Sequence, residues 1–202
     1  MSSKGQETRE RILGRAMRLA SSEGLRAITI GELARDLDLS KSGLFAHFQS
    51  KERLQVAVLE HTAEQFVQTV LGPALKMPRG EPRVRAICNN WLSWALSDDL
   101  PGGCVFIGAG AEFDDQPGQV RERLAQLQTM WFEFIAKAAR LAVDEGHFKA
   151  DLDPRQFAYE LQGIFLEFHH THRLLRFHDA ELRARQAVES IIARSRNGHP
   201  SA

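Results

Sequence analysis

The sequence predicts an all-α protein of about nine helices. Apolar residues recur at helical spacing along most of the 202-residue chain, and no segment shows the alternation of apolar and polar residues that is typical of strands. Capping and helix-breaking residues separate the helical stretches. A content of 43% hydrophobic and 26% charged residues is ordinary for a globular protein and excludes a disordered one.

The first predicted helix runs from about Thr8 to Ser22 and stops at Gly24. Two short helices follow, between residues 29 and 48, and are treated below as a motif. Ser50 is expected to cap a fourth helix that continues to Leu71, where Gly72-Pro73 should break it.

Five further helices are expected, at about residues 82–96, 104–113, 117–145, 154–177 and 179–195. Gly146 is a stop signal for the third of these. Asp153-Pro154 opens the fourth, with Asp as the cap and Pro in the first turn, and Asp179 is expected to cap the last.

Residues 29–51, TIGELARDLDLSKSGLFAHFQSK, indicate two short helices joined by a tight turn. Thr29 and Glu32 have the spacing of a capping box, and Ser40 can cap the second helix. Asp38 stands at the turn, where Asp tolerates the left-handed conformation. The outward residues of the second helix are small, polar or basic: Lys41, Ser42, Gly43, Ala46 and His47. This pattern is typical of a probe for the major groove of DNA, although a helical hairpin in an ordinary core is an alternative.

The block ITIGELARDLDLSKSGLFAHFQSKERL resembles the DNA-binding end of a tetracycline-repressor (TetR) family regulator, and the match extends over about residues 9–54. The chain departs from the family pattern at two positions. Asp38 replaces a turn glycine, and Phe45 replaces a tyrosine, which removes a phenolic contact to phosphate.

The resemblance implies a DNA-binding domain at residues 1–50 and a helical domain for effector binding and dimerisation at residues 51–202. It implies a cytoplasmic transcriptional regulator, a repressor, that binds a palindromic operator in double-stranded DNA as a homodimer. A small, largely apolar effector would release it. Residues 1–56 hold ten Lys or Arg against seven Asp or Glu, so the mild basic excess coincides with the motif.

Lys41 is the one long outward side chain at the start of the recognition helix, and it can donate to guanine O6 and N7. Ser42, Gly43 and Ala46 permit close approach to the bases. Lys41 could instead be one more phosphate contact. Four residues match family positions that touch the sugar-phosphate backbone, and Phe45 is expected against sugar or helix surface. The four are Thr29, Ser40, His47 and Lys51.

The middle of the chain is rich in aromatic residues, which are either plain core or the lining of the effector cavity that the resemblance implies. The candidate lining residues are Trp91, Trp94, Phe106, Phe113 and Trp131. Cys104 follows Pro101-Gly102-Gly103 and is a second candidate, because a thiol in the first turn of a helix could sense oxidants or electrophiles. The alternative is a small buried residue.

The last two helices are the expected dimer surface, although their apolar stripes could equally be internal core. The stripes consist of Phe157, Leu161, Ile164, Phe165, Phe168, Leu182, Val188, Ile191 and Ile192. His169 and His172 share a helical face, but no Cys or carboxylate cluster completes a metal set, so neither a metal nor a cofactor is expected.

The chain contains no Gly-rich phosphate loop, nucleophile elbow or metalloprotease motif, so an enzyme is not expected. No run of 18 apolar residues or signal segment is present, so neither membrane insertion nor export is expected, and the two cysteines are interpreted as reduced thiols. An effector-free structural DNA-binding protein remains an alternative to the regulator.

Overall fold

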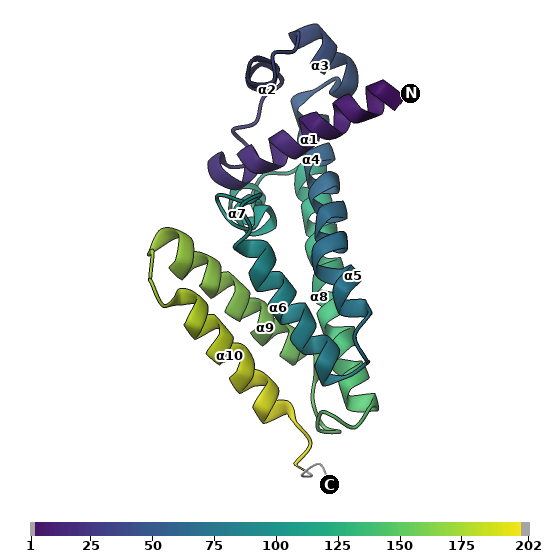
Figure 1. The fold of residues 1–202 in the computed structure, drawn as a ribbon, viewed down its shortest axis with the longest axis vertical. Helices are drawn as coiled ribbons and strands as arrows, with labels where there is room; N and C mark the ends of the chain where they lie inside the picture. The colour runs from purple at the N-terminus through teal and green to yellow at the C-terminus, as the bar shows by residue number, and fades with distance from the viewer. Residues whose placement is uncertain (1–2, 199–202) are drawn as a thin grey trace. The chain divides into compact units, whose positions relative to one another are not determined.

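The computed structural model describes residues 3–198, and its elements are helical throughout (Figure 1). The α-helices are α1 (Ser3–Glu23), α2 (Ile30–Asp36), α3 (Lys41–Phe48), α4 (Lys51–Phe66), α5 (Gly72–Leu75), α6 (Glu81–Ala95), α7 (Val105–Phe113), α8 (Gln119–Asp144), α9 (Pro154–His169) and α10 (Ala180–Ser195). Two π-helical turns, η1 (Val67–Leu71) and η2 (His170–Leu174), follow α4 and α9. Since α5 is a single turn, the prediction of an all-α chain with about nine helices is confirmed.

The predicted break at Gly72-Pro73 is wrong, because the helical path continues through η1 into α5. Proline lacks an N–H and its ring clashes with the carbonyl four residues earlier in a regular α-helix. The wider π turn before Pro73 accommodates this defect without ending the helix. The first helix also begins at Ser3 rather than near Thr8, and α9 gives way to η2 after His169 instead of running on to Phe177.

Most of the predicted caps are confirmed. Asp153 Oδ1 accepts a hydrogen bond from the Arg155 N–H at 2.8 Å, and the Arg53 N–H donates to Ser50 Oγ at 3.1 Å. Gly24 ends α1 with a φ of +93°. The prediction that the Asp179 side chain caps the last helix is wrong. Asp179 stands at the N-cap position with φ −102° and ψ 10°, outside the extended conformation of a capping residue, and its carboxylate pairs with Arg183 instead.

The described residues form two compact units, one of residues 3–66 with 96–127 and the other of residues 67–95 with 128–198. In the first unit α1 packs on α4, α2 and α7, and α3 packs on α2 and α4. Its fully buried side chains include Ile12, Leu25, Leu33, Leu44, Leu54 and Leu59. This core fixes α2 and α3 on α1 and α4.

In the second unit α9 and α10 run side by side, and α10 also contacts α6 (Figure 1). Its fully buried side chains include Ile87, Trp91, Leu92, Ile135, Phe148 and Phe165. Among the described residues, none of the helices combines the length and apolarity needed to span a bilayer.

Candidate DNA-binding surface and effector region

The helix-turn-helix is built as the sequence predicts. The Glu32 N–H donates to Thr29 Oγ1 at 3.2 Å, and the Thr29 hydroxyl donates to the Glu32 carboxylate at 2.7 Å. Ser40 Oγ accepts from the Gly43 N–H at 3.0 Å and so caps α3. Asp38 has a φ of 53°, the left-handed conformation expected at this turn.

Burial separates the two faces of α3. Leu44 and Phe48 are buried, and Arg9 of α1 stacks over the Phe48 ring with its guanidinium carbon 5.4 Å from the centroid. The side chains predicted to face the bases lie on the opposite side and are exposed: Lys41, Ser42 and Ala46. Phe45 is exposed and His47 half-buried, so the solvent face of the helix carries one aromatic ring among polar and small residues.

A shallow groove of about 430 Å³ lies between α2 and the start of α3. It brings Thr29 and Lys41 together with Arg35, an exposed basic residue that was not among the predicted contacts. The signal that could have found Arg35 is its place on the polar face of a short helix whose inner face is Leu33 and Ala34. Arg35 and Lys41 are therefore two positively charged side chains on one surface that could contact the phosphates of a DNA strand.

Three of the predicted backbone contacts already have intramolecular roles. The hydroxyls of Thr29 and Ser40 cap α2 and α3. The Lys51 ammonium donates to the Arg26 carbonyl at 2.6 Å, in the turn after α1. A lysine has three donors, so two protons of Lys51 remain for other acceptors.

The two units divide the predicted effector residues between them. In the second unit Trp91 stacks on Phe165 with centroids 4.0 Å apart, and Trp131 lies 6.3 Å from the same ring. Trp131 Nε1 also donates to Gln162 Oε1 at 3.0 Å, and Trp94 is buried. Trp91 and Trp131 therefore belong to one aromatic region around Phe165.

In the first unit Phe106 meets Phe66 edge to face at 6.1 Å, and Phe113 is buried. Cys104 is also buried and stands at the N-cap of α7, one residue before the first turn in which the sequence suggested it. Burial of the thiol restricts access by oxidants and electrophiles, so the structure gives no support to thiol sensing. Cys88, in the second unit, is buried too, and desolvation raises its pKa to about 12.

The histidines near the end of α9 form no metal cluster with other ligand-type residues in the described part of the chain. Burial lowers the pKa of His169, and the nearby charge of Arg173 adds to this effect. The His172 ring stacks on Phe168 with centroids 5.3 Å apart. These contacts are those of packed helix-end residues.

The α9–α10 stripes are largely internal. Seven of their nine residues are buried within the chain, which supports the core interpretation for these side chains: Phe157, Leu161, Phe165, Phe168, Val188, Ile191 and Ile192. Leu182 stays exposed and Ile164 is half-buried. Hence the predicted stripes are not, as a set, a surface for a partner.

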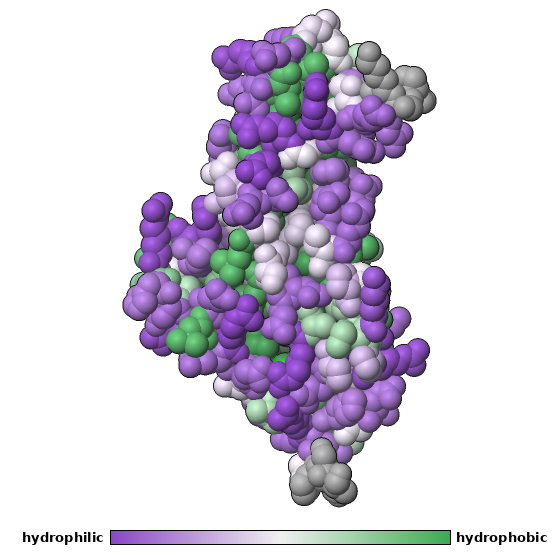
Figure 2. Space-filling model, in the orientation of Figure 1, coloured by the Kyte–Doolittle hydropathy of each residue, from purple (hydrophilic) through white to green (hydrophobic). Residues whose placement is uncertain are grey.

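The outer side of the same helix pair nevertheless carries an open groove of about 860 Å³. Small and apolar residues predominate in its lining, which includes Gly163, Ile164, Phe177, Ala180, Ala184 and Ala187. Figure 2 shows hydrophobic patches among hydrophilic residues over the region of α9 and α10. Small side chains on two adjacent helices let another helix approach closely.

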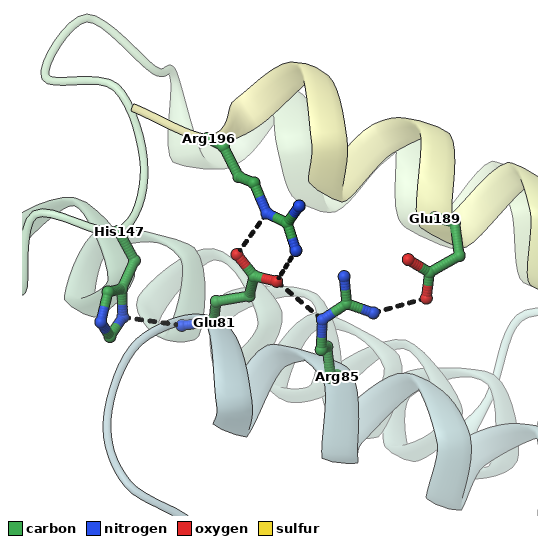
Figure 3. A network of polar contacts seen from close by, with 5 residues as sticks. All are labelled: Glu81, Arg85, His147, Glu189 and Arg196. Carbon is green, nitrogen blue, oxygen red and sulfur yellow. Dashed lines mark hydrogen bonds and ion pairs between the residues drawn. The ribbon is translucent and has the colours of Figure 1, made fainter. Parts of the chain in front are cut away.

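A polar network joins α6 to α10 and to the segment after α8 (Figure 3). Arg196 donates to both oxygens of Glu81, and Arg85 bridges Glu81 to Glu189. The Glu81 N–H, at the start of α6, donates to His147 Nδ1 at 3.1 Å. The network therefore fastens the last helix to the body of the second unit.

Two family models match the chain. The model of "Bacterial regulatory proteins, tetR family" matches residues 12–58, and that of "Tetracyclin repressor-like, C-terminal domain" matches residues 80–188. The HTH-type transcriptional regulator AcrR of Shigella flexneri is 30% identical over 161 residues, which cover 78% of this chain and 74% of AcrR.

Solved structures share the fold. A TetR transcriptional regulator from Chloroflexus aurantiacus is 25% identical, with a TM-score of 0.82 and 94% of both chains covered. The regulator AibR, solved in complex with isovaleryl coenzyme A and operator DNA, is 22% identical, with a TM-score of 0.68 and 92% of this chain and 96% of AibR covered.

Proposed function

Because the chain belongs to the TetR family of transcriptional regulators, we propose that it is a repressor, bound as a homodimer to a near-palindromic operator. A small, largely apolar effector would release it. In this proposal residues 1–50 are the DNA-binding domain, and residues 51–202 provide effector binding and dimerisation. Members of this family are DNA-binding regulators rather than enzymes.

The observation that carries the proposal is the exposed amino end of α3. Both helices of the motif are capped, and Lys41, Ser42 and Ala46 stand free of the core. A lysine with small neighbours can enter the major groove and donate to guanine O6 and N7. We therefore assign base discrimination chiefly to Lys41, supplemented by the shape of the DNA. A Lys41→Ala variant that kept its base preference at every operator position would contradict this assignment.

The remaining predicted contacts would hold the register on the DNA. Thr29, Ser40, His47 and Lys51 would approach the sugar-phosphate backbone, and Phe45 would pack against sugar. Thr29 shares a groove with Lys41, which supports a common DNA-facing surface. Arg35 lines this groove as well and adds a cation to it.

The dimer is required on physical grounds, because one recognition helix reads too few base pairs to select a site in a genome. Two recognition helices would lie roughly 34–36 Å apart, one turn of DNA. The α9–α10 groove, with its small residues and half-buried Ile164, supports a four-helix contact across a two-fold axis. The dimer surface is thus proposed for the outer face of this pair rather than for its buried stripes.

An effector site is proposed for the aromatic residues of the second unit, Trp91, Trp94 and Trp131. The other predicted lining residues, Cys104, Phe106 and Phe113, belong to the first unit. The stack of Trp91 and Trp131 about Phe165 supports an apolar ligand. AibR, which shares the fold, binds both a coenzyme A thioester and operator DNA. Effector binding would favour a state in which the two recognition helices no longer match adjacent grooves.

The deciding experiment is selection of bound duplexes from a random pool with the purified full-length chain. We expect a two-fold symmetric consensus whose half-sites are one helical turn apart. Uniform recovery of all sequences would contradict operator recognition and would favour a structural DNA-binding protein. Loss of the selected complex on addition of small apolar compounds would then identify effectors.

A further inference from the structure

In the turn between α1 and α2, the main chain of Leu25 and Arg26 is hydrogen-bonded by side chains of other helices. The N–H groups of Leu25 and Arg26 donate to the two carboxylate oxygens of Glu112, in α7, at 3.1 and 2.7 Å. The carbonyls of the same two residues accept from α4, where Gln55 Nε2 bonds Leu25 at 2.9 Å and Lys51 Nζ bonds Arg26 at 2.6 Å. Both N–H groups and both carbonyl groups of Leu25 and Arg26 therefore have a hydrogen-bond partner.

The backbone at this turn is shaped for a carboxylate. Gly24 has a φ of +93°, which favours glycine, and a Cβ at this position would lie 2.5 Å from Glu112 Oε1. A side chain at position 24 would therefore displace the carboxylate. Two successive N–H groups aimed at one anion form an anion-binding concavity. The turn residues 24–26 and Glu112 are referred to below as the cradle.

Helix α7 is tied to α1 at its other end as well. Ser21 Oγ accepts from the Gly102 N–H and donates to the Gly103 carbonyl, both at 2.8 Å. A Cβ on Gly102 would come within 1.6 Å of the Ser21 carbonyl oxygen, so the two backbones approach as only glycine allows. Both ends of α7 are thus bonded to the end of α1 and the turn that leads into the helix-turn-helix.

We propose that Glu112 is a positioning residue for DNA reading, which acts by holding the cradle and so sets the orientation of α2 and α3 on α1 and α4. The chain from Arg26 to the start of α2 at Ile30 is only four residues long, so a displaced turn displaces the motif. Charged hydrogen bonds are stronger than neutral ones, which makes the carboxylate more effective here than an amide would be. The inference rests on the proposed operator recognition.

The test compares Glu112→Ala and Glu112→Gln with Asp115→Asn in the full-length protein. Asp115 is exposed and lies three residues beyond Glu112, so its variant removes the same charge without touching the cradle. Hydrogen exchange of the Leu25 and Arg26 amides reports the cradle directly. Affinities are measured for the selected operator and for a random duplex of equal length, well below the melting temperature of each variant.

For Glu112→Ala we expect faster exchange at both amides and an operator affinity that falls roughly ten-fold, the usual order for losing charged hydrogen bonds. Affinity for the random duplex should match that of Asp115→Asn, because non-specific binding depends on phosphate charge and not on the orientation of the motif. The operator affinity of Glu112→Gln should lie between those of Glu112→Ala and Asp115→Asn, because the glutamine amide has only one oxygen that can accept a hydrogen bond.

Equal losses on operator and random duplex would overturn the positioning role, and so would an operator affinity equal to that of Asp115→Asn. If Glu112→Ala does not fold, Glu112→Gln supplies the same comparison with the side-chain volume kept. A selection that yields no preferred duplex would contradict the proposed function, whereas the amide exchange would still decide whether Glu112 holds the turn. The two failures are therefore distinguishable.

Discussion

Replacement of Glu81 should weaken the attachment of α10. Its Oε2 accepts from Arg196 Nε at 2.8 Å, and its Oε1 accepts from Arg85 Nε at 2.7 Å (Figure 3). The hydrogen bond from Arg196 is the largest cause that lowers the Glu81 pKa from 4.5 to about 2. Desolvation by burial opposes it, and the hydrogen bond from Arg85 adds to the lowering.

A pKa that falls from 4.5 to about 2 on folding corresponds to about 3 kcal/mol of stability at neutral pH. The side chain of Arg196 is 51% exposed, and solvent screening reduces the contribution. We therefore expect Glu81→Gln to lower the free energy of unfolding by about 2 kcal/mol at pH 7. Because the folded pKa is the lower one, the stabilisation is complete above pH 4.5 and is lost as the pH falls toward 2.

The assay is urea unfolding of the native chain and Glu81→Gln at pH 7 and pH 3, at one fixed protein concentration because a dimer links stability to concentration. Glu145→Gln, an exposed carboxylate of the same unit, is the matched control and should change stability by less than about 0.5 kcal/mol. At pH 3 the difference caused by Glu81→Gln should shrink to less than half. A difference that is equal at both pH values, or no larger than that of the control at pH 7, would refute the assignment.

Three further outcomes are expected. Ser40→Ala removes the cap of α3 and should cost about 1 kcal/mol of unfolding free energy, measured by urea titration, while Ser42→Ala on the same helix costs less. If the Lys51 ammonium contacts phosphate, Lys51→Ala should weaken binding to all duplexes and reduce the slope of log affinity against log salt concentration by about one. An unchanged slope with a lower operator affinity would instead show that Lys51 acts by holding the Arg26 carbonyl. Ile164→Glu puts a charge into the α9–α10 groove and should convert the dimer to monomers in sedimentation experiments, whereas the same dimer mass in both proteins would contradict the proposed interface.

Local signals in the sequence predicted most of the helices because many helix ends have a chemical marker that acts over a few residues. Ser40, Ser50 and Asp153 cap as expected, and Asp38 takes the left-handed turn. The prediction of a helix break at Gly72-Pro73 was wrong because the sequence does not reveal the wider π turn that accommodates the proline.

Long-range partners could not be predicted in the same way. Lys51 was predicted as a phosphate contact from its place in the motif, and nothing local reveals its bond to the Arg26 carbonyl. Glu112 lies 86 residues from Arg26, so its role depends on packing that brings α7 against α1. The spacing of apolar residues in α9 and α10 correctly predicted helices with one apolar face. Periodicity does not show whether such a face lies in the core or at an interface.

The bonds that join Glu112, Lys51 and Gln55 to residues 25 and 26 all end on main-chain atoms. The exposed side chain of Arg26 is therefore of little consequence to this junction. Position 24 must be glycine, and position 25 must stay apolar because the Leu25 side chain is buried in the core of the first unit. Chimeric regulators could exploit this tolerance. A reading head from a relative should be transplantable onto this chain when its turn keeps a glycine at position 24 and an apolar residue at position 25, and when Lys51 and Gln55 are retained.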